Sequence, residues 1–181
     1  MSSAVLHNAE YEIIDQDPHF TRVVSYFRPS DYLKWGLFAA SGPLYLFGAS
    51  YVQSRGKKVH VSPRFLRYSV ILGAAAGFFD RYAVYSLRFQ GAKENKREVE
   101  LDRYYVKSQL AQGKSPYTGD NENLLPKWIR SVAARNSTYS SLNLSVIPWF
   151  NFVQHEHHGV DLSKYYETRP GEEKWGFQLS K

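Results

Sequence analysis

The chain has 181 residues, and its 23 basic and 17 acidic side chains give it a formal net charge of +6 at pH 7. It contains no cysteine, which excludes a disulfide framework, a thiolate metal site and a cysteine nucleophile. No nucleic-acid recognition motif, glycine-rich phosphate loop, nucleophile elbow or haem motif is present, so we expect no nucleic acid, small-molecule substrate or cofactor.

Residues 1–30 are predicted to form a docking segment outside the membrane. The chain starts with MSSAVLHNAEYEIIDQD, which has neither the apolar core of a secretory signal nor the arginine-rich pattern of a mitochondrial presequence. Entry into an organelle would therefore use an internal signal. The string DPHFTRVVSYFRPSDYLKW follows directly before an apolar run, and its charged and aromatic residues indicate a contact with another polypeptide at a membrane edge.

The first apolar segment is predicted to be a transmembrane helix over about residues 31–53. Pro29 disfavours helix before it, and Asp31 suits the first turn, where the helix dipole favours an acid. From Trp35 to Ser54 there are twenty residues without a formal charge. At 1.5 Å per residue they extend about 30 Å, the thickness of the hydrocarbon core of a bilayer.

The second apolar segment is predicted to be a helix over about residues 63–88, since it starts with a serine-proline pair. The uncharged stretch between Arg67 and Asp80 has only twelve residues, a length that fits a membrane span or a buried helix. We favour a span, so residues 31–90 would form a transmembrane hairpin. Its basic loop, QSRGKKVHVSPR, predicts a matrix or cytoplasmic position and a possible contact with anionic lipid.

Two features of this second helix point to neighbours. Asp80 and Arg81 are adjacent, so on a helix they should not face each other, and each is expected to need a partner on another protein. Gly73 and Gly77 have the small-x-x-x-small spacing that lets helix backbones approach closely. They could pack the two helices of the hairpin together or contact a helix of a larger partner, and both interpretations stay open.

Residues 91–181 are predicted to be an extramembrane helix followed by a long irregular tail. The helix, which begins after Gly91, carries many charges and is expected to be exposed. The tail has little periodicity but many aromatic residues, such as Trp149 and Phe150. Ordering such a segment costs about 1 to 2 kcal/mol of backbone entropy per residue, so we expect it to order against a partner.

The string HEHH at residues 155–158 raises the alternative of a metal-dependent membrane enzyme. Zinc proteases place two histidines four residues apart on a helix, with the acid between them. Here His155, His157 and His158 have other offsets and lie in an extended segment. We therefore predict interface histidines and no bound metal.

The strings DPHFTRVVSYFRPSDY (residues 17–32) and IPWFNFVQHEHHGVD (residues 147–161) carry a family resemblance. The first resembles the N-terminal signature of the fungal 21 kDa accessory subunit of mitochondrial NADH:ubiquinone oxidoreductase, respiratory complex I. The second is similar to the C-terminal region of that family. The resemblance implies a non-catalytic, cofactor-free accessory subunit of the membrane arm, multi-pass in the mitochondrial inner membrane, with core subunits of complex I as partners.

The sequence thus predicts a mainly α membrane protein: a two-helix transmembrane hairpin, an amphipathic helix and an irregular C-terminal tail. The alternative function is a free hairpin protein that tethers or shapes the endoplasmic reticulum. Asn136 and Asn143 match the glycosylation acceptor pattern, and a glycan on either would favour this alternative, but without secretory entry we expect them to stay unmodified. The residues expected to contact partner subunits are Asp17, His19, Phe20, Arg22, Phe27, Arg28, Pro29, Asp31, Tyr32, Gly73, Gly77, Asp80, Arg81, Trp149, Phe150, His155 and His158.

Overall fold

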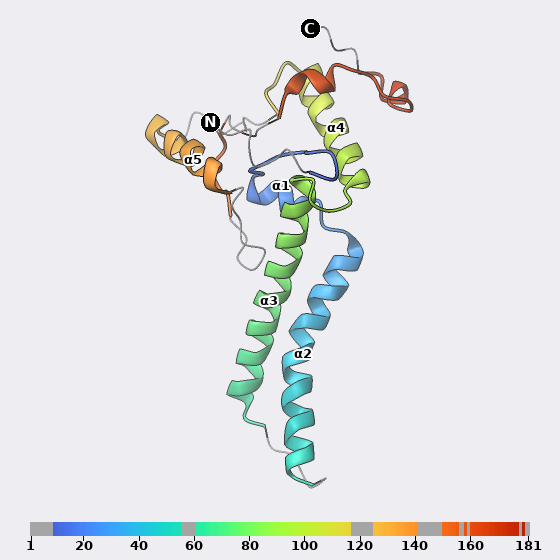
Figure 1. Cartoon of the computed structure of the whole chain (residues 1–181). Helices are drawn as coiled ribbons and strands as arrows, with labels where there is room; N and C mark the ends of the chain where they lie inside the picture. Colours follow the sequence, from blue (N-terminus) through green and yellow to red (C-terminus); the bar gives the residue numbers. More distant parts are fainter. Residues whose placement is uncertain are drawn as a thin grey trace. The chain divides into compact units, whose positions relative to one another are not determined.

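The computed structural model describes residues 9–55, 61–116, 125–140, 150–155, 158, 160–177 and 179, with the backbone alone for 136–140. The described chain is mainly helical (Figure 1). Its elements are α1 (Phe20–Ser25), α2 (Pro29–Gln53), α3 (Pro63–Phe89), α4 (Lys96–Ala111), α5 (Lys127–Ser140) and the short 3-10 helices η2 (Leu162–Tyr165) and η3 (Glu173–Trp175).

The chain divides into two compact units. The hairpin unit is Tyr26–Val84, and the terminal unit combines the residues up to Ser25 with those from Tyr85 onward. Helix α3 belongs to the hairpin unit through Val84 and to the terminal unit from Tyr85.

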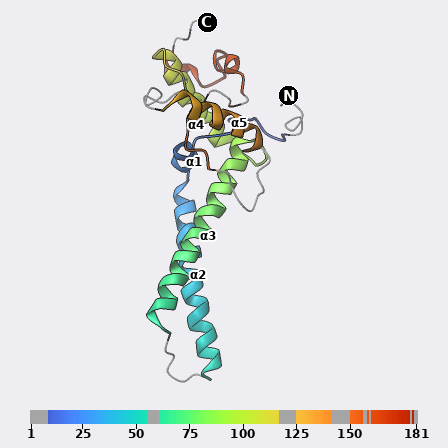
Figure 2. The same cartoon turned by 90° about the vertical axis from the view of Figure 1, so that its left-hand side faces the viewer.

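In the hairpin unit, α2 begins where local signals favour a helix start. The Asp31 carboxylate accepts a hydrogen bond from the backbone N–H of Arg28 at 2.9 Å, and Pro29 occupies the first helical turn. Helix α2 and the hairpin-unit part of α3 run side by side in opposite directions, as Figures 1 and 2 both show. The Trp35 indole N–H donates to the Ala74 carbonyl at 2.6 Å and joins the two helices.

The predicted transmembrane hairpin, and with it the multi-pass topology, is wrong. In the part of the chain that the structure describes, no helix is both long and apolar enough to cross a membrane. The uncharged run of α2 is diluted by glycine, serine, tyrosine and Pro43, which have little hydropathy. The apolar stretch of α3 ends at Arg67 on one side and at Asp80 on the other. A bend at Pro43 and an outward-reaching Arg67 were expected to make these helices tolerable in a bilayer, but their hydropathy is too low for a span.

In the terminal unit, the N-terminal segment crosses the C-terminal end of α3. The backbone N–H of Ile14 donates to the Phe89 carbonyl at 2.8 Å, and that of Tyr11 donates to the Gly91 carbonyl at 3.1 Å. Gly91 has φ +74°, and an added Cβ would lie 2.6 Å from the Tyr11 carbonyl oxygen, so this crossing requires glycine. Ile14, Phe89 and Tyr165 are buried in the core of this unit.

Helix α4 buries a charged face. The sequence predicted an exposed helix here, and that prediction was wrong, because the buried charges meet opposite charges within the chain. Glu98, which is fully buried, lies within 3.5 Å of Arg88 and 3.1 Å of Arg97. The buried residues of α4 are Glu98, Val99, Asp102, Arg103, Val106 and Lys107.

Candidate subunit interface

A buried cluster of charges lies where the N-terminal segment, α1 and α4 meet. Arg22 of α1 donates to Asp15 at 3.0 Å and also to Asp102 of α4. Its guanidinium lies over the rings of Phe89 and Tyr105, 5.7 and 5.5 Å from their centroids. Arg22 therefore neutralises two carboxylates that belong to different segments of the chain.

Asp102 is almost fully buried in this cluster, with 1% of its surface exposed. Burial raises the pKa of its carboxyl, and the neighbouring charge of Asp15 acts in the same direction. Arg22 and the hydroxyl of Tyr165, which donates to Asp102 at 2.5 Å, oppose that increase in the pKa. The carboxylate is tolerated because two donors from separate segments satisfy it.

Two histidines extend the cluster to the C-terminal segment. His155 Nε2 lies 2.7 Å from the Asp17 carboxylate, and His158 Nδ1 lies 2.7 Å from the Asp15 carboxylate. Their rings stack, with centroids 4.7 Å apart and an interplanar angle of 7°. The second ring nitrogen of His158 lies 2.7 Å from the His155 carbonyl, so both ring nitrogens of His158 have a polar neighbour within the chain.

The histidines of this cluster bond to carboxylates of the chain. Among the described residues, no three histidine, cysteine, aspartate or glutamate side chains are placed to hold a metal ion. His157, the third histidine of the metal hypothesis, lies outside the described residues. The geometry of His155 and His158 is that of buried hydrogen bonds to carboxylates of segments that are more than a hundred residues away.

A second buried cluster joins α4 to the C-terminal segment. Arg103 and Lys107, one turn apart on α4, both donate to the Glu172 carboxylate, Lys107 at 2.7 Å. Burial alone would raise the pKa of Glu172, but hydrogen bonds from Arg103, from the backbone N–H of Arg169 and from Lys107 outweigh it and lower the pKa to about 2. The spacing of Arg103 and Lys107 was the sequence signal for this site, but nothing local identified Glu172.

In the hairpin unit, Arg81 bonds to two carboxylates, those of Asp80 and Asp31. The Arg81 guanidinium donates to the Asp80 carboxylate at 2.8 Å and to the Asp31 carboxylate of α2 at 3.3 Å. The expectation that each ion needs a partner on another protein was wrong. The long arginine side chain can fold back onto its neighbour, and the antiparallel helix supplies the second carboxylate.

Gly73 and Gly77 lie where α3 approaches α2 most closely. A Cβ added at Gly73 would lie 2.4 Å from the Phe38 carbonyl oxygen. One added at Gly77 would lie 2.7 Å from the Phe38 Cβ and 2.9 Å from the Trp35 ring. The structure shows the first interpretation of this spacing, in which the glycines pack the two helices of the hairpin against each other.

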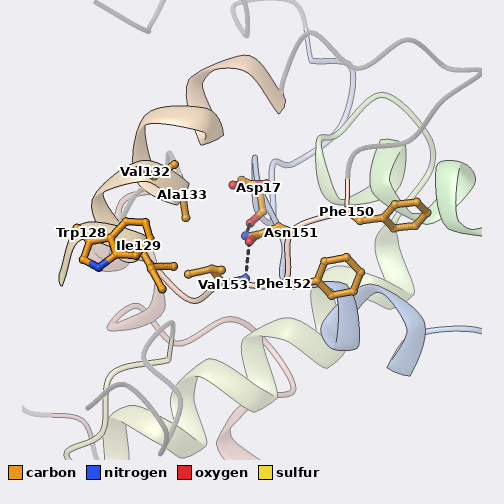
Figure 3. Close-up of a pocket in the computed structure, with 9 residues that line it drawn as sticks. All are labelled: Asp17, Trp128, Ile129, Val132, Ala133, Phe150, Asn151, Phe152 and Val153. Carbon is orange, nitrogen blue, oxygen red and sulfur yellow. Dashed lines mark hydrogen bonds between the residues drawn. The ribbon is translucent and has the colours of Figure 1, made fainter. Parts of the chain in front are cut away.

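An apolar groove lies between α5 and residues 150–153 in the terminal unit (Figure 3). It has a volume of about 370 Å³. Trp128 and Phe152 are 68% and 62% exposed at this groove, so large apolar side chains there are open to solvent. The lining residues are Asp17, Trp128, Ile129, Val132, Ala133, Phe150, Asn151, Phe152 and Val153.

Comparisons with known proteins give the same family for both halves of the chain. Residues 8–94 match the family model of the NADH-ubiquinone oxidoreductase complex I, 21 kDa subunit, and residues 89–181 match the C-terminal model of the NADH-ubiquinone oxidoreductase 21 kDa subunit. The NADH-ubiquinone oxidoreductase 20.9 kDa subunit of Neurospora crassa is 39% identical over 160 residues, which cover 88% of this chain and 83% of that protein. The chain belongs to the complex I 21 kDa subunit family.

Membership of the 21 kDa subunit family confirms the prediction of a complex I subunit that is structural and not catalytic. It implies a mitochondrial location and other complex I subunits as partners. The alternative of a free hairpin protein of the endoplasmic reticulum loses its basis, because both halves of the chain match a subunit of this complex.

Several predicted contact residues of this 21 kDa family member are engaged with the chain itself. Phe27 is 6% exposed, and its ring centroid lies 6.3 Å from that of Phe78. The ring centroid of Phe20 lies 5.7 Å from that of Phe150 and 4.8 Å from that of Phe152. These contacts position the N-terminal string, and a direct role of its residues at a subunit interface stays a prediction.

The remaining predicted contacts are more open. Tyr32 is 52% exposed, and His19 is half-buried beside a neighbouring threonine hydroxyl at 2.8 Å. Arg28 and Pro29 form the start of α2. Trp149 lies outside the described residues. The sequence argument did not select the α5 residues of the groove, although their amphipathic spacing was present as a signal.

Proposed function

We propose that this chain is an accessory subunit that supports the assembly and stability of the membrane arm of complex I. Because the chain belongs to this family, its partners are other subunits of complex I. The assembly role, the inner-membrane location and the contact with membrane-arm core subunits are our inference from the surface of the hairpin unit.

The observation that carries this proposal is the apolar surface of the hairpin unit. On α2, Leu44 and Tyr45 are 69% and 75% exposed, and on α3, Phe65 and Leu72 are 67% and 70% exposed. Contiguous apolar surfaces of this kind are rare on free monomers and mark interaction sites. Covering each such side chain contributes about 1.5 to 3 kcal/mol, so helices of core subunits would bind this surface strongly.

The buried ion pairs within the chain also support apolar packing as the main contact with core subunits. Asp31 and Arg81 satisfy each other within the hairpin unit, and the charge clusters of the terminal unit are satisfied within that unit. Neither unit relies on a partner to neutralise these buried charges. Apolar packing by α2 and α3 then provides the main contact with core subunits.

The test is incorporation of a charged hairpin variant into the complex. Leu44→Glu in cells that lack the native chain should reduce the amount of assembled complex I, because it puts a charge into the covered surface. Leu101→Glu is the matched control, since it makes the same change at a 41% exposed leucine of α4. For both variants, blue-native gels measure the assembled complex by NADH dehydrogenase staining and the incorporated chain by an antibody against it.

A Leu44→Glu variant that enters the complex as fully as the wild type would contradict the proposal. Circular dichroism of both purified variants shows whether the helices form, so a folding defect is distinguished from a docking defect. On blue-native gels of intact mitochondria, migration of the wild-type chain as a small free species would also contradict the proposal.

A further inference from the structure

Helix α5 is amphipathic in a way that the proposed function does not use. At about 100° per residue, Trp128, Ile129, Val132 and Ala133 fall within an arc of about 140° on one face of the helix. All four line the groove that faces residues 150–153 (Figure 3).

This apolar face is open to its surroundings. Trp128 is 68% exposed and Val132 is 40% exposed. Phe152, across the groove, is 62% exposed, so apolar surface continues from the helix onto the neighbouring segment. A tryptophan with this exposure on an amphipathic helix is typical of the boundary between water and hydrocarbon.

The charges of α5 all have the same sign. Lys127, Arg130 and Arg135 lie outside the apolar arc, and the sequence of α5 contains no acidic residue. Among the described residues that line the groove, the one acid is Asp17, which is 3% exposed and lies 2.7 Å from the His155 ring. The charge that the described residues of α5 and the groove present outward is therefore positive.

We propose that α5 lies on an anionic lipid surface, with its apolar face in the boundary between headgroups and acyl chains and its cations at the phosphates. A membrane-surface helix combines an apolar face that carries tryptophan with basic residues on the other face. The part of the α5 face formed by Trp128, Ile129, Val132 and Ala133 has apolar area with cations beside it, which fits an anionic lipid surface. The contact lies along the membrane surface, and it goes beyond the proposed function because it requires no other subunit.

The absence of cysteine makes a site-specific test possible. In the full chain, a spin label is attached at Val132→Cys on the apolar face or at Ser131→Cys on the polar face. The chain is mixed with vesicles of phosphatidylcholine alone or with added phosphatidylglycerol. With phosphatidylglycerol, the label at 132 should lose collisions with a water-soluble nickel reagent and gain collisions with oxygen, while the label at 131 should keep its nickel collisions.

Charge reversal tests the electrostatic part of the contact. Lys127→Glu with Arg135→Glu should weaken the anionic-vesicle response at 132 at least about twenty-five-fold in apparent affinity, since each cation contributes about five-fold. Lys93→Glu with Lys96→Glu reverses two exposed cations outside α5 and should leave the response unchanged.

Two results would overturn the proposal. One is a label at 132 that collides equally with the nickel reagent in the presence and absence of anionic vesicles. The other is protection of that label only in purified, lipid-depleted complex I, which would make the groove a protein interface. Incorporation into complex I is measured separately, so failure of the lipid contact is distinguishable from failure of the accessory role.

Discussion

Gly73→Ala should destabilise the hairpin unit, although alanine is the better helix former. The added Cβ would lie 2.4 Å from the Phe38 carbonyl oxygen, a backbone atom that cannot move without separating α2 from α3. Overpacking of this kind costs about 1 to 3 kcal/mol, and the helix preference for alanine returns about 0.5 to 1 kcal/mol. Because the contact is with backbone, we expect a net loss near 2 kcal/mol.

Matched glycines on α2 provide the control. Nothing lies within 4 Å of a Cβ added at Gly36 or Gly48, so Gly36→Ala and Gly48→Ala should stabilise the chain by about 0.5 to 1 kcal/mol. At Gly77 the nearest atoms belong to the side chains of Phe38 and Trp35, and an aromatic ring can shift. Gly77→Ala should therefore fall between these two cases.

Urea denaturation of the full chain, followed by far-ultraviolet circular dichroism, measures these differences from the shift of the midpoint at constant slope. From most to least stable, the expected order is Gly36→Ala, wild type, Gly77→Ala and Gly73→Ala. If Gly73→Ala is as stable as Gly36→Ala, the close contact between α2 and α3 is not present in solution.

The other predictions concern the buried charges of the terminal unit. Glu172→Gln should lower the free energy of unfolding at pH 7 by about 3 kcal/mol, because two buried cations lose their counterion, whereas Glu173→Gln on the exposed neighbour should change it by less than about 0.5 kcal/mol. Folding lowers the pKa of Glu172 from 4.5 to about 2, so its stabilising charge is fully present above pH 4.5 and is lost as the pH falls toward 2. The free energies of unfolding of wild type and Glu172→Gln should therefore converge as the pH falls through that window. A difference that stays constant with pH would refute the assignment of this stabilising charge to Glu172. Arg22→Met should cost about 3 kcal/mol in thermal or urea unfolding, with Lys93→Met as a neutral control. His158→Ala should lower stability by about 1 to 3 kcal/mol and leave the metal content, measured by atomic emission, unchanged; a loss of bound metal would restore the metal hypothesis.

The helices of the hairpin were accessible to sequence reasoning because their signals are local. A proline and an acid mark the start of α2, and the serine-proline pair stands at the start of α3. Whether these helices could cross a membrane could not be predicted from such local signals. Twenty uncharged residues have the length of a span, but glycine, serine and Pro43 reduce the hydropathy of α2, so length alone gave the wrong membrane prediction.

The sequence selected Arg22, Asp17 and His155 as contacts with partner subunits, and that role stays a prediction. Their contacts within the chain were not predicted. The sequence could not show that His155 meets Asp17, because 138 positions separate them and no periodicity relates them. Asp102 and Glu172 were missed because a charged side chain is usually solvated, and its burial becomes tolerable only when a distant partner is present.

This pairing explains why the two strings that carry the family resemblance occur in one chain. Residues 17–20 of the first string contact residues 151–155 of the second in the terminal unit, where the Phe20 backbone N–H donates to the Asn151 carbonyl at 2.6 Å. The Asp17 carboxylate lies 2.7 Å from His155 Nε2 beside that contact. Both side chains are buried, and each would leave a polar group unsatisfied in the core without the other. These residues of the two strings therefore depend on each other for their buried hydrogen bonds.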